Sequence, residues 1–195
     1  RQLSQLTRLM PTVLLEPNSH QLVSGAPELR RRYLDWGMFH VEQGFLESWR
    51  DYSRALKQRN AALRREQVEV LDSLDAVLVE AGLRLGSLRE RFAERVAERM
   101  QSVLGDLRAR VKGIELSYQA GWKGKSFEAD LSERRGRDLE RAQTGAGPHR
   151  ADLLFSCDGR PARAVLSRGE QKAFAAALVL TQAALLNEHG KRPVL

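Results

Sequence analysis

A stretch without proline, residues 28–147, constrains this fold more than any other feature of the sequence. All six prolines lie nearer to the two ends of the chain. Because proline interrupts the interior of an α-helix, its absence allows long helices here. Within the stretch, apolar residues repeat in alternating steps of three and four, as in a coiled-coil seam. The residues of this seam are Leu71, Leu74, Leu78, Ala81, Leu85, Leu88 and Phe92.

The seam does not continue as a regular heptad pattern. Its next apolar positions, Val96 and Met100, follow in steps of four, which locally unwind a supercoil. Gly82 and Gly86 weaken the helix in its middle. We therefore expect a helix pair packed on itself, or an arm on a globular body, rather than a long free coiled coil.

Local signals predict further elements along the chain. Pro27 stands where a helix can begin, because proline is favoured in the first turn. Apolar runs, alternation and turn residues define the others. The expected elements are a buried strand at 12–15, helices from Pro27 and over 44–65, a strand at 114–118, a polar helix at 127–142, a β-hairpin with strands 153–155 and 164–166, and a buried helix at 169–188.

Composition narrows the class of protein. The 195 residues include 32 Lys and Arg against 25 Asp and Glu, a net charge of +7, and 26 of the basic residues are arginine. Arginine favours bidentate contacts to phosphate or carboxylate. The single cysteine, Cys157, excludes a disulfide framework and a cysteine-based zinc site. No apolar run approaches the length needed to span a bilayer, so we expect a soluble, cytoplasmic protein without a membrane partner.

Gly124-Lys125-Ser126 is similar to the end of a phosphate-binding P-loop, but the motif is incomplete. A P-loop requires a glycine five residues before Gly124, where the turn directs backbone amides towards phosphate. That position is occupied by Gln119. We therefore interpret the segment as a glycine-rich connection.

The segment 166–172, just before the expected buried helix, is the strongest candidate site. Ser167 can cap the helix, and Glu170 three residues later completes a capping box. Capping does not account for Gly169, which would let backbone amides approach a ligand closely. A helix N-terminus with such a turn favours an anion. Spacing alone leaves both a structural cap and a phosphate site open.

Basic residues gather on the first two expected helices. Arg30, Arg31 and Arg32 are consecutive, so on a helix they spread around its circumference. One interpretation is that one of them pairs with a nearby carboxylate while the others are solvated. The alternative is that they contact DNA phosphates. Lys57 and Arg59 belong to a second basic stretch, on the following helix.

The histidines do not indicate a catalytic or metal site. His149 lies beside Arg150, but no serine or cysteine nucleophile is placed with it by spacing. The four histidines are scattered along the chain and form no metal-binding set. We interpret residues 147–153 as a structural loop.

Four segments together resemble one family. The residues Leu166–Gln171 resemble the signature motif of ABC-type and SMC-type ATPases. Three further segments, 27–36, 56–60 and 147–153, are similar to segments of RecF recombination mediators, and all four occur in the family's order. The match covers nearly the whole chain, with 66–142 as its least distinctive part. The chain therefore resembles the RecF family.

The resemblance implies an α/β fold overall, the P-loop ATPase head of ABC and SMC proteins, of which this mainly α-helical chain would form part. Residues 1–26 would contain the Q-loop region, 27–142 would form a helical arm lobe, and 143–195 would carry the signature motif. The chain begins without methionine, and Leu195 would lie on the Walker B strand. We therefore expect an internal fragment without Walker A and Walker B motifs, which does not hydrolyse ATP alone.

The resemblance also implies a nucleotide site shared by two protomers. Each signature turn would close on ATP and Mg²⁺ held by the other protomer of an ATP-dependent homodimer. Gln21, in the Q-loop region, is a further candidate contact. The contacts in trans would come from Ser167, Arg168, Gly169, Glu170 and Gln171, with the serine and the glycine nearest the γ-phosphate.

By the same resemblance, the complete protein would act in DNA repair and replication restart. It would bind double-stranded and single-stranded DNA, have RecR and RecO as partners, help to load RecA at single-strand gaps, and hydrolyse ATP slowly in the presence of DNA. The residues expected to contact DNA are Arg30, Arg31, Arg32, Lys57 and Arg59.

Two other functions fit parts of the sequence. A helical scaffold protein would use the seam at 71–111 for partner helices, and its turn at 167–169 would serve only as a cap. Another SMC-like ATPase would carry the same signature, but such relatives usually have a far longer coiled coil. We rank both below the RecF-like function.

Overall fold

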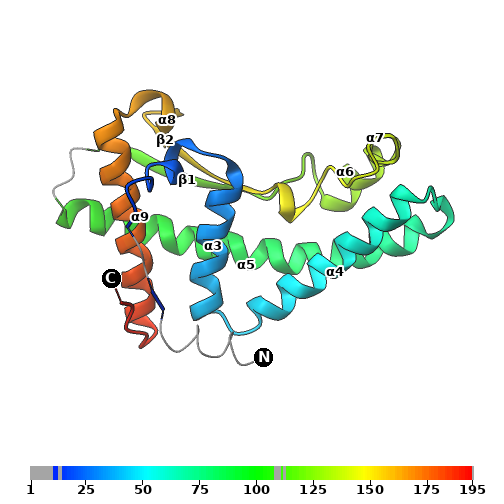
Figure 1. Ribbon diagram of the computed structural model, residues 1–195, viewed down its shortest axis with the longest axis horizontal. Helices are drawn as coiled ribbons and strands as arrows, with labels where there is room; N and C mark the ends of the chain where they lie inside the picture. The colour runs from blue at the N-terminus through cyan, green and yellow to red at the C-terminus, as the bar shows by residue number, and fades with distance from the viewer. Residues whose placement is uncertain (1–10, 13–14, 108–110, 112, 195) are drawn as a thin grey trace. The chain divides into compact units, whose positions relative to one another are not determined.

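The computed structural model describes residues 11–12, 15–107, 111 and 113–194, and the chain folds into two compact units (Figure 1). The first unit comprises residues 1–42, 91–118 and 153–195, and the second comprises residues 43–90 and 119–152. The domain boundaries expected after residues 26 and 142 do not coincide with these divisions. The assignment of the units to an ATPase lobe and an arm lobe stays a prediction.

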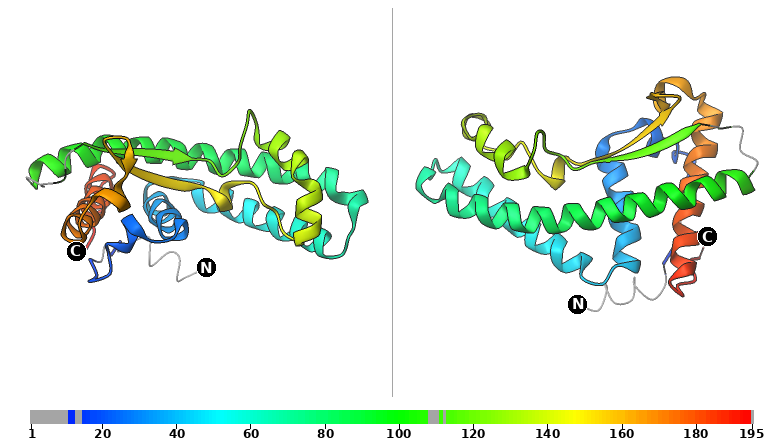
Figure 2. Two further views of the ribbon diagram at one scale, coloured as in Figure 1. Left: turned by 90° about the horizontal axis from the view of Figure 1, so that it is seen from above. Right: turned by 180° about the vertical axis from the view of Figure 1, so that it is seen from behind.

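Helices predominate in both units, as expected (Figure 2). The first unit contains α2 (Gln21–Ser24), α3 (Pro27–Val41), α8 (Ala162–Val165), α9 (Arg168–Glu188) and most of a sheet of β1 (Ile114–Gln119), β2 (Asp152–Cys157) and β3 (Arg160–Pro161). The last residue of β1 and the first residue of β2 are assigned to the second unit. The second contains α4 (Phe45–Arg64), η1 (Val68–Val70), α6 (Phe127–Glu133), α7 (Arg135–Arg141) and η2 (Pro148–Arg150). Helix α5 (Leu71–Asp106) begins in the second unit and ends in the first.

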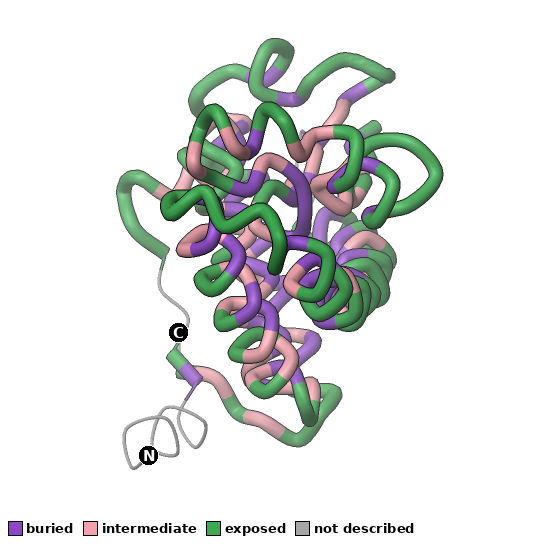
Figure 3. The backbone as a smooth tube through the Cα atoms, turned by 90° about the vertical axis from the view of Figure 1, so that its right-hand side faces the viewer, coloured by how far each residue is buried: buried purple, intermediate pink, exposed green. Residues whose placement is uncertain are grey.

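The core of the first unit is built around α9, which packs against α2 and α3. Buried positions recur along the helices between exposed ones (Figure 3). On α9, Phe174 and Leu178 are fully buried. The hydroxyl of Tyr33 on α3 donates to the backbone oxygen of Leu178 at 2.8 Å, and burial raises the pKa of Tyr33 well above its usual range. A neutral Tyr33 therefore ties the two helices together.

The sheet corrects one expectation. Its strand order is β1-β2-β3, and β2 pairs antiparallel with β3 in the register Ser156 to Pro161. The turn between them has positive φ at both central residues, as a tight two-residue hairpin requires. The expected second strand at 164–166 is wrong, because α8 occupies 162–165. The side-chain amide of Gln171 donates to the Leu166 oxygen at 3.0 Å, which holds this region against α9 instead of a strand.

The seam at 71–92 is confirmed as one side of a continuous helix, α5. The two glycines within it make room for aromatic rings. A Cβ atom on Gly82 would lie 2.6 Å from the ring of Phe127, and one on Gly86 would lie 3.1 Å from the ring of Trp122. The glycines that weaken the helix locally therefore allow close packing in the second unit.

The expected helix at 127–142 is two helices, α6 and α7, which meet at Arg134. Gly136 lies in the first turn of α7, and its low helix propensity weakens a continuous helix at this place. The chain leaves α7 at Ala142, whose φ is 50°. Residues 144–147 form a loop, and η2 begins at Pro148.

The terminal segments differ from the expected buried strand at 12–15. Thr12 forms an isolated parallel bridge with Val194. Leu15 is 61% exposed and Val194 is 51% exposed, so this part of the expected strand is not buried. Val13, Leu14 and Leu195, including its expected place on a Walker B strand, lie outside the described residues.

Candidate nucleotide and DNA contacts

The signature turn forms the N-terminus of α9, with Ser167 as its capping residue. The Ser167 oxygen accepts from the Glu170 amide at 3.3 Å, and the Glu170 carboxylate accepts from the Ser167 amide at 2.8 Å. This is the capping box that the sequence predicts. The serine hydroxyl also donates to the same carboxylate at 2.7 Å, so three hydrogen bonds link Ser167 and Glu170.

Arg168 and Gly169 lie on the exposed surface of the turn. A Cβ atom on Gly169 would meet nothing within 4 Å, so no contact among the described residues requires glycine there. The amides of Arg168 and Gly169 belong to the first helical turn, which offers them no intrahelical acceptor. The turn therefore presents two amides and an open surface, as an approaching anion would need.

Gln171 is buried, unlike Ser167, Arg168 and Gly169 of the signature motif. The side-chain amide of Gln171 donates to the backbone oxygens of Arg163 and Leu166. These bonds fix the chain that enters the turn. Gln171 therefore shapes the turn from within rather than standing on its exposed surface.

Helix α2 brings Gln21 into the same unit as the signature turn, and α2 packs against α9. Gln21 itself is exposed. Its neighbour His20 lies with Nε2 at 2.9 Å from Arg168 Nη1. His20 could not be selected from the sequence, because it lies 148 positions from Arg168 along the chain.

The three consecutive arginines of α3 have three different environments. Arg30 is buried, and its guanidinium donates to the Gly25 backbone oxygen at 2.8 Å. Arg31 is half-buried, and Arg32 is exposed and paired with Glu28 at 2.5 Å. Arg30 is therefore withdrawn as a DNA contact, because its guanidinium is committed to the backbone at the start of α3.

The second basic stretch, on α4, also contains both an exposed and a buried cation. Lys57 is exposed on α4, whereas the side chain of Arg59 has 0% exposure. Arg59 donates to Asp75 at 2.5 Å and to Asp138 at 2.7 Å. Arg59 is likewise withdrawn as a DNA contact, because it is enclosed between two carboxylates.

His149 is a packed residue of the second unit. Its Nε2 lies 3.0 Å from the Thr144 backbone oxygen, and its Nδ1 lies 2.6 Å from the Tyr52 hydroxyl. Because a carbonyl oxygen only accepts, Nε2 carries a proton, and in the neutral imidazole Nδ1 then accepts from the tyrosine. These contacts support a structural loop at 147–153. Within the described parts of the chain, no cluster of side chains could hold a metal ion, and no helix is long and apolar enough to cross a membrane.

Comparison with known proteins identifies the family. No protein-family model matches the chain. A DNA replication and repair protein RecF from Xanthomonas euvesicatoria is 43% identical over 200 residues, which cover 100% of this chain and 54% of that protein. RecF from Stenotrophomonas maltophilia is also 43% identical, over 198 residues with the same coverage. This chain is a RecF homologue.

The solved structures agree in fold. A structure described as the recombination mediator protein RecF-ATP in the RecFOR pathway has a TM-score of 0.86 and 24% sequence identity, and the match covers 95% of this chain and 54% of that one. The chain thus spans about half the length of the RecF proteins that it matches. The part that is matched includes both units and the signature turn.

Proposed function

We propose that the complete protein is a RecF-type DNA replication and repair protein that acts as a recombination mediator. The observation that carries the proposal is 43% identity to RecF along the whole chain. A helical scaffold has no need of similarity at 27–36, 56–60 and 147–153 as well as in the signature turn. The basic composition, with a net charge of +7, suits binding to nucleic acid.

In this proposal, the signature turn contacts ATP held by the second protomer of a homodimer. Bound ATP and Mg²⁺ would supply the phosphoryl group and the charge that neutralises it. The residues of this chain would bind and orient the γ-phosphate. The amides of Arg168 and Gly169 and the positive end of α9 favour the γ-phosphate, and the open surface at Gly169 admits it.

Phosphate binding would require an exchange of partners at Ser167. Its hydroxyl now donates to the Glu170 carboxylate, and a phosphate oxygen would replace that carboxylate as the acceptor. The two backbone hydrogen bonds of the capping box, from the Ser167 amide to the Glu170 carboxylate and from the Glu170 amide to Ser167 Oγ, can persist, so the helix keeps its cap. Ser167 would thereby link the end of α9 to the nucleotide of the other protomer.

The similarity to RecF also supports a wider role for the complete protein in DNA repair. The complete protein would be a slow, DNA-dependent ATPase that uses dimerisation as a switch and binds double-stranded and single-stranded DNA. With RecR and RecO it would help to load RecA at single-strand gaps. Arg31, Arg32 and Lys57 remain proposed DNA contacts.

The substitution Ser167→Arg in the complete protein tests the nucleotide role. A long cation should block the exposed turn, so dimerisation in ATP and Mg²⁺ should be lost, as measured by light scattering coupled to size-exclusion chromatography. Ser132→Arg is the matched control, because Ser132 is also exposed but lies on α6. Unchanged ATP-dependent dimerisation in Ser167→Arg would overturn the proposal and favour a scaffold with a capped helix.

A further inference from the structure

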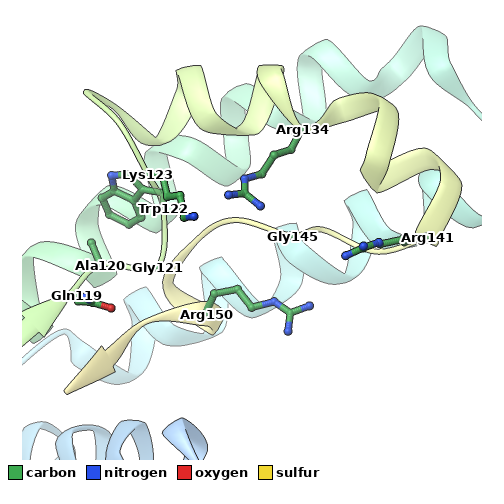
Figure 4. Close-up of a pocket in the computed structure, with 9 residues that line it drawn as sticks. All are labelled: Gln119, Ala120, Gly121, Trp122, Lys123, Arg134, Arg141, Gly145 and Arg150. Carbon is green, nitrogen blue, oxygen red and sulfur yellow. The ribbon is translucent and has the colours of Figure 1, made fainter. Parts of the chain in front are cut away.

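The second unit contains an open pocket of about 610 Å³ that the signature motif does not include (Figure 4). A pocket of this size is within the usual range for ligand sites. It lies among the end of β1, the two short helices α6 and α7, and the loop before β2. The residues that line it are Gln119, Ala120, Gly121, Trp122, Lys123, Arg134, Arg141, Gly145 and Arg150.

Four of these nine residues are cationic, and three of the four are not neutralised by a carboxylate of the described chain. Only Arg134 is engaged in an ion pair within the described chain, with the buried carboxylate of Asp130 at 2.6 Å; this bond raises the pKa of Arg134. Lys123, Arg141 and Arg150 are exposed, and no described acidic group pairs with them. In Figure 4 the guanidinium groups of Arg134, Arg141 and Arg150 point towards the same space. The pocket is therefore strongly positive.

The backbone that carries these cations is fixed at several points. The Gly147 amide donates to the Gly121 oxygen at 2.9 Å, and a Cβ atom on Gly121 would lie 2.2 Å from the Gly147 oxygen. Arg89 of α5 donates to the Pro148 oxygen at 2.7 Å. The Lys123 amide donates to Asp130 at 2.9 Å. Segments that are distant in sequence are thus held together before any ligand binds.

Trp122 is the one aromatic residue among those that line the pocket, and its ring packs against other side chains. Trp122 stacks on Phe127, with ring centroids 5.0 Å apart, and its edge lies against Gly86. It forms a wall rather than a free platform for a nucleobase. Ligand recognition therefore falls to the cations, and arginine presents paired donors that suit phosphate oxygens.

We propose that this pocket binds backbone phosphates of DNA, independently of base sequence and of the signature turn. The inference rests on the proposed function, since a DNA repair protein must hold DNA, and it assigns that task to residues outside the signature. A phosphate contact explains why Arg150 is exposed although its neighbours Pro148 and Ala151 are buried. It gives the segment 147–153 a binding role beside its structural one.

The test compares two double variants of the complete protein that each remove two positive charges. Arg141→Ala with Arg150→Ala removes the pocket cations. Lys125→Ala with Arg137→Ala removes exposed cations of the same unit that do not line the pocket. Binding to a fluorescent DNA duplex of arbitrary sequence is measured by anisotropy over a series of salt concentrations, without nucleotide.

The pocket variant should bind more weakly to every duplex sequence. The slope of log affinity against log salt concentration should become less steep by roughly two, because each lost phosphate contact reduces its magnitude by about 0.9. The control variant should keep the parental slope. Equal slopes for the pocket variant and the parent, with circular dichroism unchanged, would overturn the inference, as would equal losses in the two variants.

Two further measurements separate this inference from the proposed function. ATP-dependent dimerisation of the pocket variant should equal that of the parent, whereas Ser167→Arg should lose it. If the pocket variant loses ATP binding and keeps DNA affinity, the pocket is a nucleotide site and the inference fails. If the parent binds no DNA, the inference fails while the dimerisation result still decides the role of the signature turn.

Discussion

The interior of the first unit around α9 is made largely of apolar side chains such as Phe174 and Leu178, and its buried Arg30 donates to a backbone oxygen. The second unit instead encloses a guanidinium group that is paired with carboxylates. Arg59 lies there between Asp75 and Asp138, with Thr144 as a further acceptor at 2.9 Å. Arg135 adds a second cation to Asp75 at 2.7 Å. We call these residues the Arg59 cluster. It joins α4, α5, α7 and the loop after α7, which are distant in sequence.

We expect the free energy of unfolding to respond differently to substitutions in these two interiors. Apolar packing loses free energy in proportion to the atoms and volume removed. A buried ion pair contributes little net stability when intact, yet the loss of one partner leaves an uncompensated charge. The second unit should therefore depend on single side chains more steeply than the first.

The largest effect is expected for Arg59→Ala. Removing this guanidinium leaves Asp75 and Asp138 without their buried cation, which should lower the free energy of unfolding by about 3–5 kcal/mol. Urea denaturation followed by circular dichroism measures the change. Lys57→Ala, on the same helix but exposed, should stay within about 0.5 kcal/mol of the parent.

A double-mutant cycle sharpens this prediction. Asp75→Ala in the Arg59→Ala background should cost less than in the parent, because the unpaired carboxylate is then absent, with a coupling energy of about 0.5–3 kcal/mol. Strictly additive losses would show that Arg59 acts through packing alone, and the contrast between the two units would disappear.

In the first unit, Leu178→Ala should lower the free energy of unfolding by about 2–5 kcal/mol, through lost burial and the cavity left behind. The Tyr33 bond to its backbone oxygen can persist. Val165→Ala, at a position 39% exposed, is the control and should change little. The same urea series applies, and a cost below about 1 kcal/mol would mean that this core repacks freely.

The smallest effect is expected for Gly82→Ala, which tests packing in the second unit without touching a charge. The new methyl group would meet Phe127 at 2.6 Å, so we expect a loss of about 1–3 kcal/mol despite the better helix propensity of alanine. Gly105→Ala on the same helix meets nothing within 4 Å and should gain up to about 1 kcal/mol. A gain at both positions, in thermal melting, would contradict the packing account.

Much of the secondary structure was predictable because its signals are local. The seam at 71–92 marks the buried side of α5, Pro27 begins α3, and Ser167 with Glu170 caps α9. The break at Arg134 and the helix in place of a strand at 164–166 were missed. At 162–166 the side-chain amide of Gln171, on the following helix, donates to the Arg163 and Leu166 oxygens, a side-chain contact that apolar alternation does not reveal.

The helical character, the capped turn at Ser167 and the relationship to RecF could be predicted from the sequence, because each depends on short spacings or ordered motifs. Which basic residues are exposed became known only from the folded chain. Lys57 and Arg59 are two positions apart on one helix, yet only the first is exposed. Lys123, Arg141 and Arg150 share one pocket although long segments separate them. Side-chain exposure and convergence arise from contacts across the chain, which local spacing does not encode.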